Sequence, residues 1–137
     1  MKTIVVLRYV SIFILLALMG CEENLNDQTF TLGQASIMRV GQLYTSTDGQ
    51  YTLIIKELND SRCPQGVVCV WAGEVILKGE WTKNSLKSTF ELHSVMEGSQ
   101  KQPDGFTIRI QDVKPYPVAG TTTRPEDLVI TVLIQKN

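Results

Sequence analysis

Apolar and polar residues alternate along most of the chain after its first thirty positions, and this two-residue period predicts β-strands. The clearest stripe starts at Val67 and continues at every second residue to Trp81. We expect this strand to bend or bulge at Gly73 or Gly79. Trp71 and Trp81 share the apolar parity of the stripe, so we expect both indoles to pack in the core; a sugar-binding platform is the alternative.

Other segments show the same period. Phe106, Ile108 and Ile110 alternate with polar residues, and 128–134 forms a last stripe with apolar residues on both faces, as in a strand inside a sheet. Three further strands are predicted at 36–44, 51–58 and 86–93, and a short edge strand at 29–34. The Asp-Gly pair at 48–49 predicts a hairpin, whereas 94–105 and 115–125 have the Gly, Pro and polar content of surface connections.

About seven short strands in some 110 residues, without a convincing helical period, predict an all-β fold. The expected architecture is an antiparallel β-sandwich with immunoglobulin-like proportions, and a small β-barrel is the alternative. Residues 29–137 are enough for one hydrophobic core and too few for two. We therefore expect a single β-domain over this range.

The first residues have a different character. Lys2 precedes an apolar stretch that ends in Gly20 and Cys21. This arrangement resembles a bacterial lipoprotein signal. The resemblance implies that residues 1–20 are removed and that the Cys21 sulfur is lipidated. Residues 21–28 would then be a tether of at most roughly 25 Å between the bilayer and the β-domain.

Two other interpretations of this segment stay open: a plain secretory signal with an incidental cysteine, and a retained transmembrane helix. The apolar run from Ile4 to Gly20 covers about 17 residues and is interrupted by Arg8 and Tyr9, which is short of the roughly 20 that a span needs. The lipoprotein interpretation predicts a protein of the bacterial cell envelope, anchored to a membrane through acylated Cys21 and facing outside the cytoplasm.

The charge balance excludes one class of partner. Without Lys2 and Arg8, the chain keeps 11 basic and 14 acidic residues, a formal net charge of −3. Binding to nucleic acids depends on clustered Lys and Arg side chains that neutralise phosphates, and the sequence has no such cluster. We expect no nucleic-acid partner.

The remaining cysteines, Cys63 and Cys69, form an even pair in an exported chain, where disulfides persist. Pro64 and Gly66 between them favour a chain reversal, so we predict a Cys63–Cys69 disulfide. The pair lacks the two-residue spacing of zinc-ribbon or thioredoxin-like motifs, and we expect neither a metal nor a cofactor.

The ring that this disulfide closes has three interpretations. It is a structural staple, a partner-binding loop whose backbone is pre-organised, or a protease-inhibiting loop that offers Arg62 or a loop residue to the enzyme. In the second case the contact residues would be Arg62, Gln65, Val67 and Val68.

Each of these cysteines belongs to a short motif, and a third motif follows later in the chain. The three are Ser61-Arg62-Cys63-Pro64, Cys69-Val70-Trp71-Ala72-Gly73 and Lys114-Pro115-Tyr116-Pro117. Together they resemble a signature of small bacterial secreted proteins and lipoproteins of uncharacterised function. The resemblance covers the middle and late parts of the chain, and it implies no particular activity.

The residues that would support catalysis are sparse. His93 is the only histidine, and its neighbours supply no recognisable nucleophile, so we expect a half-exposed histidine at a strand end and no catalytic residues. The sequence therefore predicts a non-catalytic envelope lipoprotein whose β-domain binds an envelope protein or a glycan, or acts as a scaffold. The alternative is a small envelope hydrolase or redox protein that uses His93 or the Cys63/Cys69 pair.

Overall fold

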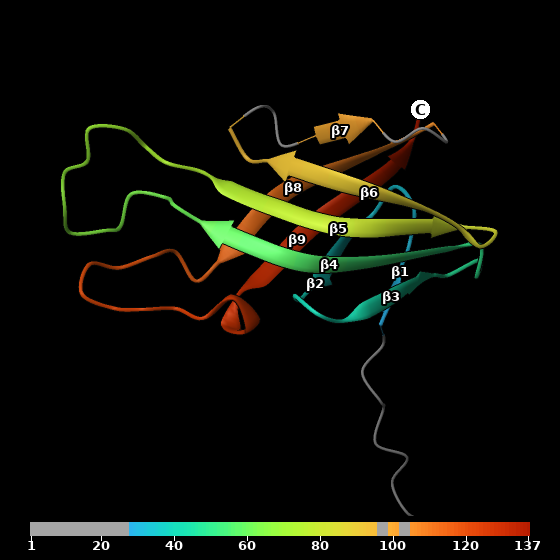
Figure 1. Cartoon of the computed structure of the whole chain (residues 1–137), viewed down its shortest axis with the longest axis horizontal. Coiled ribbons are helices and arrows are strands. Elements are labelled where there is room, and N and C mark those ends of the chain that lie inside the picture. Colours follow the sequence, from blue (N-terminus) through green and yellow to red (C-terminus); the bar gives the residue numbers. More distant parts are fainter. Residues whose placement is uncertain (1–27, 96–98, 102–104) are drawn as a thin grey trace, which may run out of the picture.

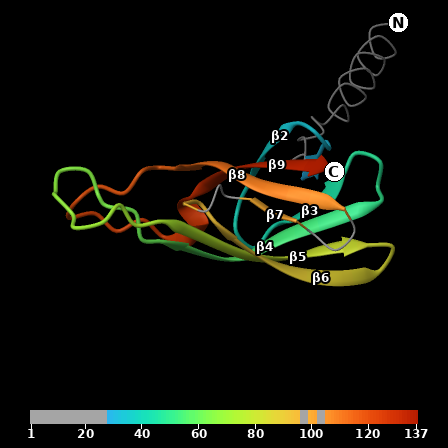
Figure 2. The ribbon, with the colours of Figure 1, turned by 90° about the horizontal axis from the view of Figure 1, so that it is seen from above.

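The computed structural model describes residues 28–95, 99–101 and 105–137, so the predicted signal and Cys21 lie outside the described residues. The described chain forms two β-sheets that face each other (Figures 1 and 2). The elements are β1 (Thr29–Phe30), β2 (Ala35–Met38), β3 (Leu43–Ser46), β4 (Tyr51–Asp60), β5 (Val75–Lys83), β6 (Leu86–His93), β7 (Ser99–Lys101), β8 (Phe106–Lys114), the 3₁₀ turn η1 (Pro125–Asp127) and β9 (Val129–Lys136).

One sheet has the strand order β1-β3-β4-β5-β6, and the other has the order β2-β9-β8-β7. All neighbouring strands are antiparallel except β1 and β3, which are parallel. The predicted all-β sandwich is confirmed, and β1 corresponds to the start of the edge strand predicted at 29–34. Strand β7 is additional and lies within the predicted surface connection 94–105. The barrel alternative is wrong, because the strands form two separate sheets. Strand β9 lies between β2 and β8, as its apolar residues on both faces predicted.

The predicted strand at 36–44 is divided between the two sheets. Its first part belongs to β2, which pairs with β9, whereas its second part belongs to β3, which pairs with β4. Gly41 lies between them with a φ of 79°, and its N–H donates to the carbonyl oxygen of Ile55 at 2.8 Å. The predicted hairpin at Asp48-Gly49 joins β3 to β4, where the N–H of Gly49 donates to the carbonyl oxygen of Ser46.

The long strand predicted from Val67 is shorter in the structure. Only β5 is a strand, and 67–74 belongs to a loop. Gly73 has a φ of 69°, and a Cβ at this position would lie 1.8 Å from the carbonyl oxygen of Ser61, so the chain turns there before β5 begins. The bulge lies in β4 between Ile55 and Glu57, on the strand opposite Gly79.

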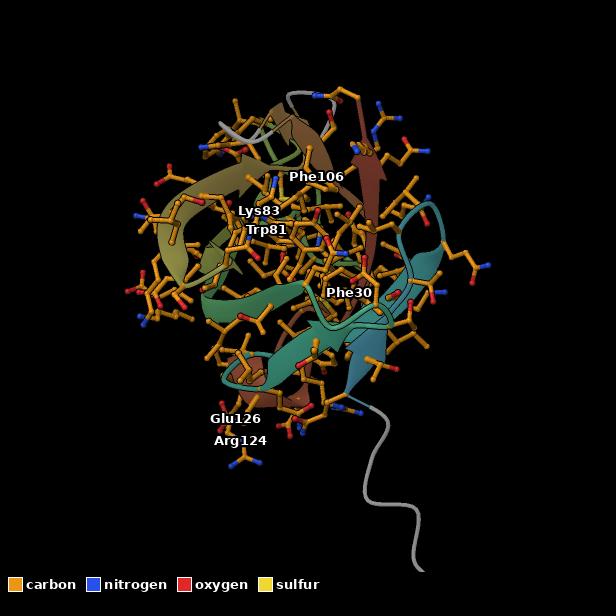
Figure 3. All side chains as sticks on the ribbon, turned by 90° about the vertical axis from the view of Figure 1, so that its right-hand side faces the viewer. Phe30, Trp81, Lys83, Phe106, Arg124 and Glu126 are labelled. Atoms are coloured by element: carbon orange, nitrogen blue, oxygen red, sulfur yellow. A yellow bond between two sulfur atoms is a disulfide. The ribbon has the colours of Figure 1, made fainter. Side chains whose placement is uncertain are left out.

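The core at one end of the sandwich is an aromatic cluster of Phe30, Tyr51, Trp81 and Phe106 (Figure 3). The ring of Tyr51 stacks on that of Trp81 with 5.1 Å between centroids, and the ring of Phe106 lies 5.2 Å from that of Trp81. The ammonium group of Lys83 lies 5.7 Å from the Tyr51 ring centroid and covers the cluster from outside.

Both sheets contribute to the core. All of the buried apolar residues in the described part of the chain lie between Phe30 and Ile134. These residues form one cluster between the two sheets, as a single independently folding domain requires.

Candidate binding site: the loop arm

Two long loops leave the same end of the sandwich side by side (Figures 1 and 2). The first loop, 61–74, connects β4 to β5, and the second, 115–123, follows β8. They are joined at Gln65, whose N–H donates to the carbonyl oxygen of Pro117 at 2.9 Å and whose carbonyl oxygen accepts from the N–H of Ala119 at 3.0 Å. The two loops therefore form one body, which we call the loop arm.

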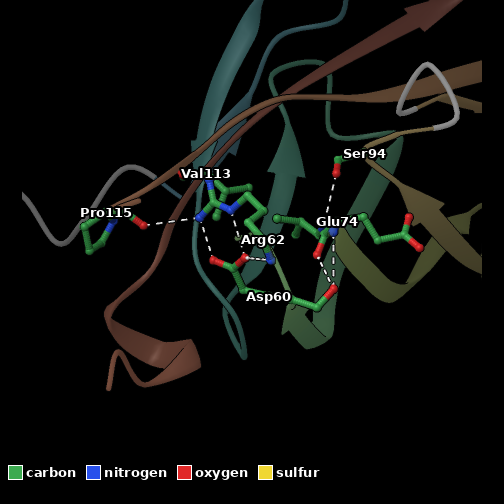
Figure 4. Close-up of polar contacts among 8 residues, drawn as sticks. Asp60, Arg62, Glu74, Ser94, Val113 and Pro115 are labelled. Carbon is green, nitrogen blue, oxygen red and sulfur yellow. Dashed lines mark hydrogen bonds and ion pairs between the residues drawn. The ribbon is translucent and has the colours of Figure 1, made fainter. Parts of the chain in front are cut away.

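Arg62 ties the two loops together at the base of the arm (Figure 4). Its guanidinium forms a two-pronged ion pair with the Asp60 carboxylate, with Nε donating to Oδ1 at 2.8 Å and Nη2 donating to Oδ2. Nη1 also donates to the carbonyl oxygen of Val113 at 2.8 Å, and the guanidinium carbon lies 4.6 Å from the Tyr116 ring centroid. The end of β4 is thus attached to the end of β8 through one side chain.

This environment determines what Arg62 can do. The side chain is only 13% exposed, and its hydrogen bonds to Asp60 raise its pKa further above the ordinary value, against the opposing effect of burial. Its guanidinium is therefore turned inward, and its N–H groups donate to acceptors within the chain. In the structure Arg62 braces the arm, although the sequence placed it among the contact residues.

Backbone contacts between the two sides of the first loop continue outward from the strands. The N–H of Ser61 donates to the carbonyl oxygen of Glu74 at 2.8 Å, and the N–H of Cys63 donates to that of Ala72 at 2.7 Å. Further out, the predicted disulfide joins Cys63 to Cys69, with 5.9 Å between their Cα atoms. The first loop is thus closed covalently beyond its hydrogen-bonded stem.

The outer part of the arm is apolar and exposed. Val68 and Val70 are fully exposed, and the Trp71 side chain is 73% exposed, so the prediction that Trp71 packs in the core is wrong. Six of the ten large apolar residues that are exposed in the described part of the chain lie on the arm: Val67, Val68, Val70, Trp71, Tyr116 and Val118.

Two of the predicted contact residues, Val67 and Val68, belong to this exposed group, and Gln65 supports it by joining the loops. Val70, Trp71 and the second loop were not predicted as parts of the site. The sequence contains one signal for them: neither 63–73 nor 115–123 has a charged residue. Apolar residues in an uncharged loop are expected at a contact surface as well as in a core.

His93 lies at the end of β6, as predicted, and its two ring nitrogens both face carboxylates. Nδ1 lies 3.0 Å from Oε2 of Glu74, and Nε2 lies 3.0 Å from Oε1 of Glu91. The hydrogen bond to Glu74, and then the one to Glu91, raise the pKa of His93, which favours the doubly protonated ring. A general base needs a free ring nitrogen, so this arrangement fits an ion network better than catalysis.

A groove of about 460 Å³ lies on the outer face of the five-stranded sheet near Pro125. Both lysines that line it pair with carboxylates: Lys56 with Glu80, and Lys78 with Glu91 at 3.3 Å. In the part of the chain that the structure describes, no group of three or more His, Cys, Asp or Glu residues is arranged to hold a metal ion.

The described geometry is that of a β-sandwich with a braced apolar arm at one end. No family model, no curated protein and no solved structure matches the chain. Among residues 28–95, 99–101 and 105–137, no helix is long and apolar enough to cross a membrane.

Proposed function

We propose that this protein is a lipid-anchored protein of the bacterial cell envelope whose β-domain is a non-catalytic binding module. Its binding surface is the loop arm. The observation that carries the proposal is the gathering of exposed apolar side chains on one braced protrusion. Contiguous apolar patches on soluble domains mark sites of contact with proteins, membranes or ligands.

The construction of the arm supports a binding role. The Arg62 contacts, the bridge at Gln65 and the Cys63–Cys69 disulfide all restrain its backbone before any partner arrives. A pre-organised loop loses less conformational entropy on binding, so more of the contact energy becomes affinity.

The sequence resemblances point in the same direction. The motifs that resemble those of small secreted proteins and lipoproteins, 61–64, 69–73 and 114–117, all map to the loop arm or its base. The lipoprotein-like signal supports an anchor at Cys21, which would attach the β-domain to a membrane.

The anchor is tested in bacteria that express the full chain and receive a fatty acid with an alkyne label. The native chain should incorporate the label, whereas Cys21→Ser should not. Equal labelling of the two chains, or an unlabelled native chain with an intact leader, would contradict the anchor and leave the arm to be judged separately.

The binding role is tested by site-specific photocrosslinking in the same cells. A photoreactive residue at Val68 should give discrete adducts with an envelope protein, a glycan or lipid, whereas one at Leu86 should give none. Leu86 is a matched control because it is 77% exposed and apolar, and it begins β6 at the end of the sandwich opposite the arm. The same adduct pattern from both positions, or none from Val68, would contradict binding through the arm.

A further inference from the structure

The loop arm has no charged residue beyond its base. The stretches 63–73 and 115–123 contain only apolar and uncharged polar residues. The nearest cations are already paired: Arg62 with Asp60, Lys114 with Asp112 at 3.0 Å, and Arg124 with Asp127 at 3.0 Å. An approaching surface therefore meets an apolar tip with no free cation at its rim.

The side chains at the tip are those that favour a membrane interface. Trp and Tyr are enriched where lipid headgroups meet hydrocarbon, because their rings combine an apolar body with one polar group. Trp71 lies on the first loop with the fully exposed Val68 and Val70, and Tyr116 lies on the second loop beside Arg62 at the base of the arm. The arm is a convex protrusion, which a deformable bilayer accommodates and a protein partner accommodates only with a matching cavity (Figure 2).

The backbone hydrogen bonds of the arm limit how deeply it can enter a membrane. Moving a polar group from water into an apolar medium raises the free energy unless the group keeps a hydrogen bond. The N–H and carbonyl groups of Gln65 are both bonded within the arm, as are the N–H groups of Cys63, Ala119 and Thr121. These bonds hold the stem of the first loop and its junction with the second loop, so insertion has to be shallow enough to keep the backbone of 66–71 in the hydrated headgroup region.

We propose that the loop arm docks on a phospholipid bilayer, with Val68, Val70 and Trp71 entering its interfacial region. This inference deepens the proposed function and rests on it, since it names the partner of the same surface. The bilayer contact is a second one, separate from an acyl anchor on Cys21. Because the tip is uncharged and the nearby cations are paired, apolar burial drives docking, and neutral phosphatidylcholine is sufficient.

The test uses residues 22–137 with phosphatidylcholine vesicles, because this segment contains the core cluster from Phe30 to Ile134 and lacks the leader and Cys21. The chain has two tryptophans, and Trp81 is buried, so a change in emission on adding vesicles reports on Trp71. Emission should shift to the blue and be quenched by lipids brominated on their acyl chains. Trp71→Phe should abolish the shift and the quenching.

Affinity is measured by sedimentation of the vesicles. A Val68→Asp, Val70→Asp double variant should bind at least tenfold more weakly, because two apolar contacts are replaced by charges that resist leaving water. Leu86→Asp, the matched control on an exposed residue at the other end, should bind as the native domain does. Unchanged melting temperatures would show that both variants are folded. Adding anionic lipid or raising the salt concentration should alter the affinity by less than about twofold.

Three results would overturn the inference: no blue shift with vesicles, equal weakening by Leu86→Asp, or binding that requires anionic lipid. The crosslinking experiment separates this failure from that of the proposed function. Protein adducts from Val68 without vesicle binding would keep the binding module and replace the bilayer with a protein partner. Absence of both would reject the two proposals together.

Discussion

Trp81 and Trp71 lie ten residues apart on the same apolar parity, and their environments are opposite. Trp81 is 1% exposed and packs against Phe30, Tyr51 and Phe106 from both sheets, whereas Trp71 projects from the loop arm. At Trp81 a second sheet lies opposite, and at Trp71 the first loop has already left both sheets. Alternation in the sequence thus indicates an apolar face, but the chain segment opposite decides whether that face is buried.

The two ends of the molecule are also held together by different forces. The aromatic end depends on apolar burial and ring packing. The arm depends on the Asp60–Arg62 pair, the bridge at Gln65 and a disulfide. At the arm, polar contacts and a disulfide fix the backbone, whereas apolar packing fixes it in the rest of the domain. The apolar side chains of the arm therefore remain exposed and available for contact.

The contrast between the buried Trp81 and the exposed Trp71 can be tested by truncating each side chain. Trp81→Ala should destabilise the domain by about 3–5 kcal/mol, because it empties a large site in a packed core. Trp71→Ala should change the free energy of unfolding by less than about 0.5 kcal/mol, because it removes an exposed side chain. Urea denaturation of both variants measures the difference. Similar losses would mean that Trp71 is packed in solution.

A second comparison sets two arginines against each other. Arg62→Ala should lower the free energy of unfolding by about 2–3 kcal/mol. The substitution leaves the half-buried Asp60 carboxylate and the Val113 carbonyl without their partner. Arg124→Ala is the control, since Arg124 is 68% exposed and its partners Glu126 and Asp127 are also exposed (Figure 3). Arg124→Ala should lower the free energy of unfolding by less than about 1 kcal/mol. Equal costs in chemical denaturation would show that Arg62 does not brace the arm.

Reduction of the disulfide should have a moderate effect that is confined to the arm. A ring of this size contributes about 2 kcal/mol in the chain-entropy model, so the reduced domain should melt at a lower temperature and remain folded. Hydrogen exchange should accelerate in 61–74 and stay unchanged around Trp81. A melting curve that does not respond to reduction, together with two free thiols, would contradict the bond.

The smallest expected effect is the pH dependence from His93. Its pKa is raised in the folded state by Glu74 and then Glu91, so its contribution to stability is fully present below the unfolded value of about 6.5 and is lost as the pH rises through the folded value. The hydrogen bond from His93 in turn lowers the pKa of Glu91, whose contribution is lost on acidification. The melting temperatures of the native domain and His93→Gln should therefore converge as the pH rises from 6 to 9. A constant difference would mean that the ring is not protonated.

Much of the fold could be predicted from local pattern, because a strand covered on one face shows its period directly. The β6 strand, the Asp48-Gly49 hairpin and the interior position of β9 are examples. The change of sheet between β2 and β3 could not be predicted, since residues that favour strands continue on both sides of Gly41. Sheet membership depends on distant partners that a local period does not contain.

The site was predicted only in part, for a similar reason. The spacing of Cys63 and Cys69 indicated the staple, but nothing near them indicates that 115–123 lies alongside. The role of Arg62 depends on Val113 and Pro115, which are about fifty positions away in the sequence. The inward direction of the Arg62 side chain could therefore be recognised only from the three-dimensional arrangement of both loops.

The bridge at Gln65 has a consequence for engineering and for evolution. Because each loop completes the hydrogen bonds of the other, changing the length of one alone would leave unpaired backbone groups in its neighbour. Grafting of this arm onto another β-scaffold should therefore succeed only when both segments are transplanted together, as a single cassette with two insertion points.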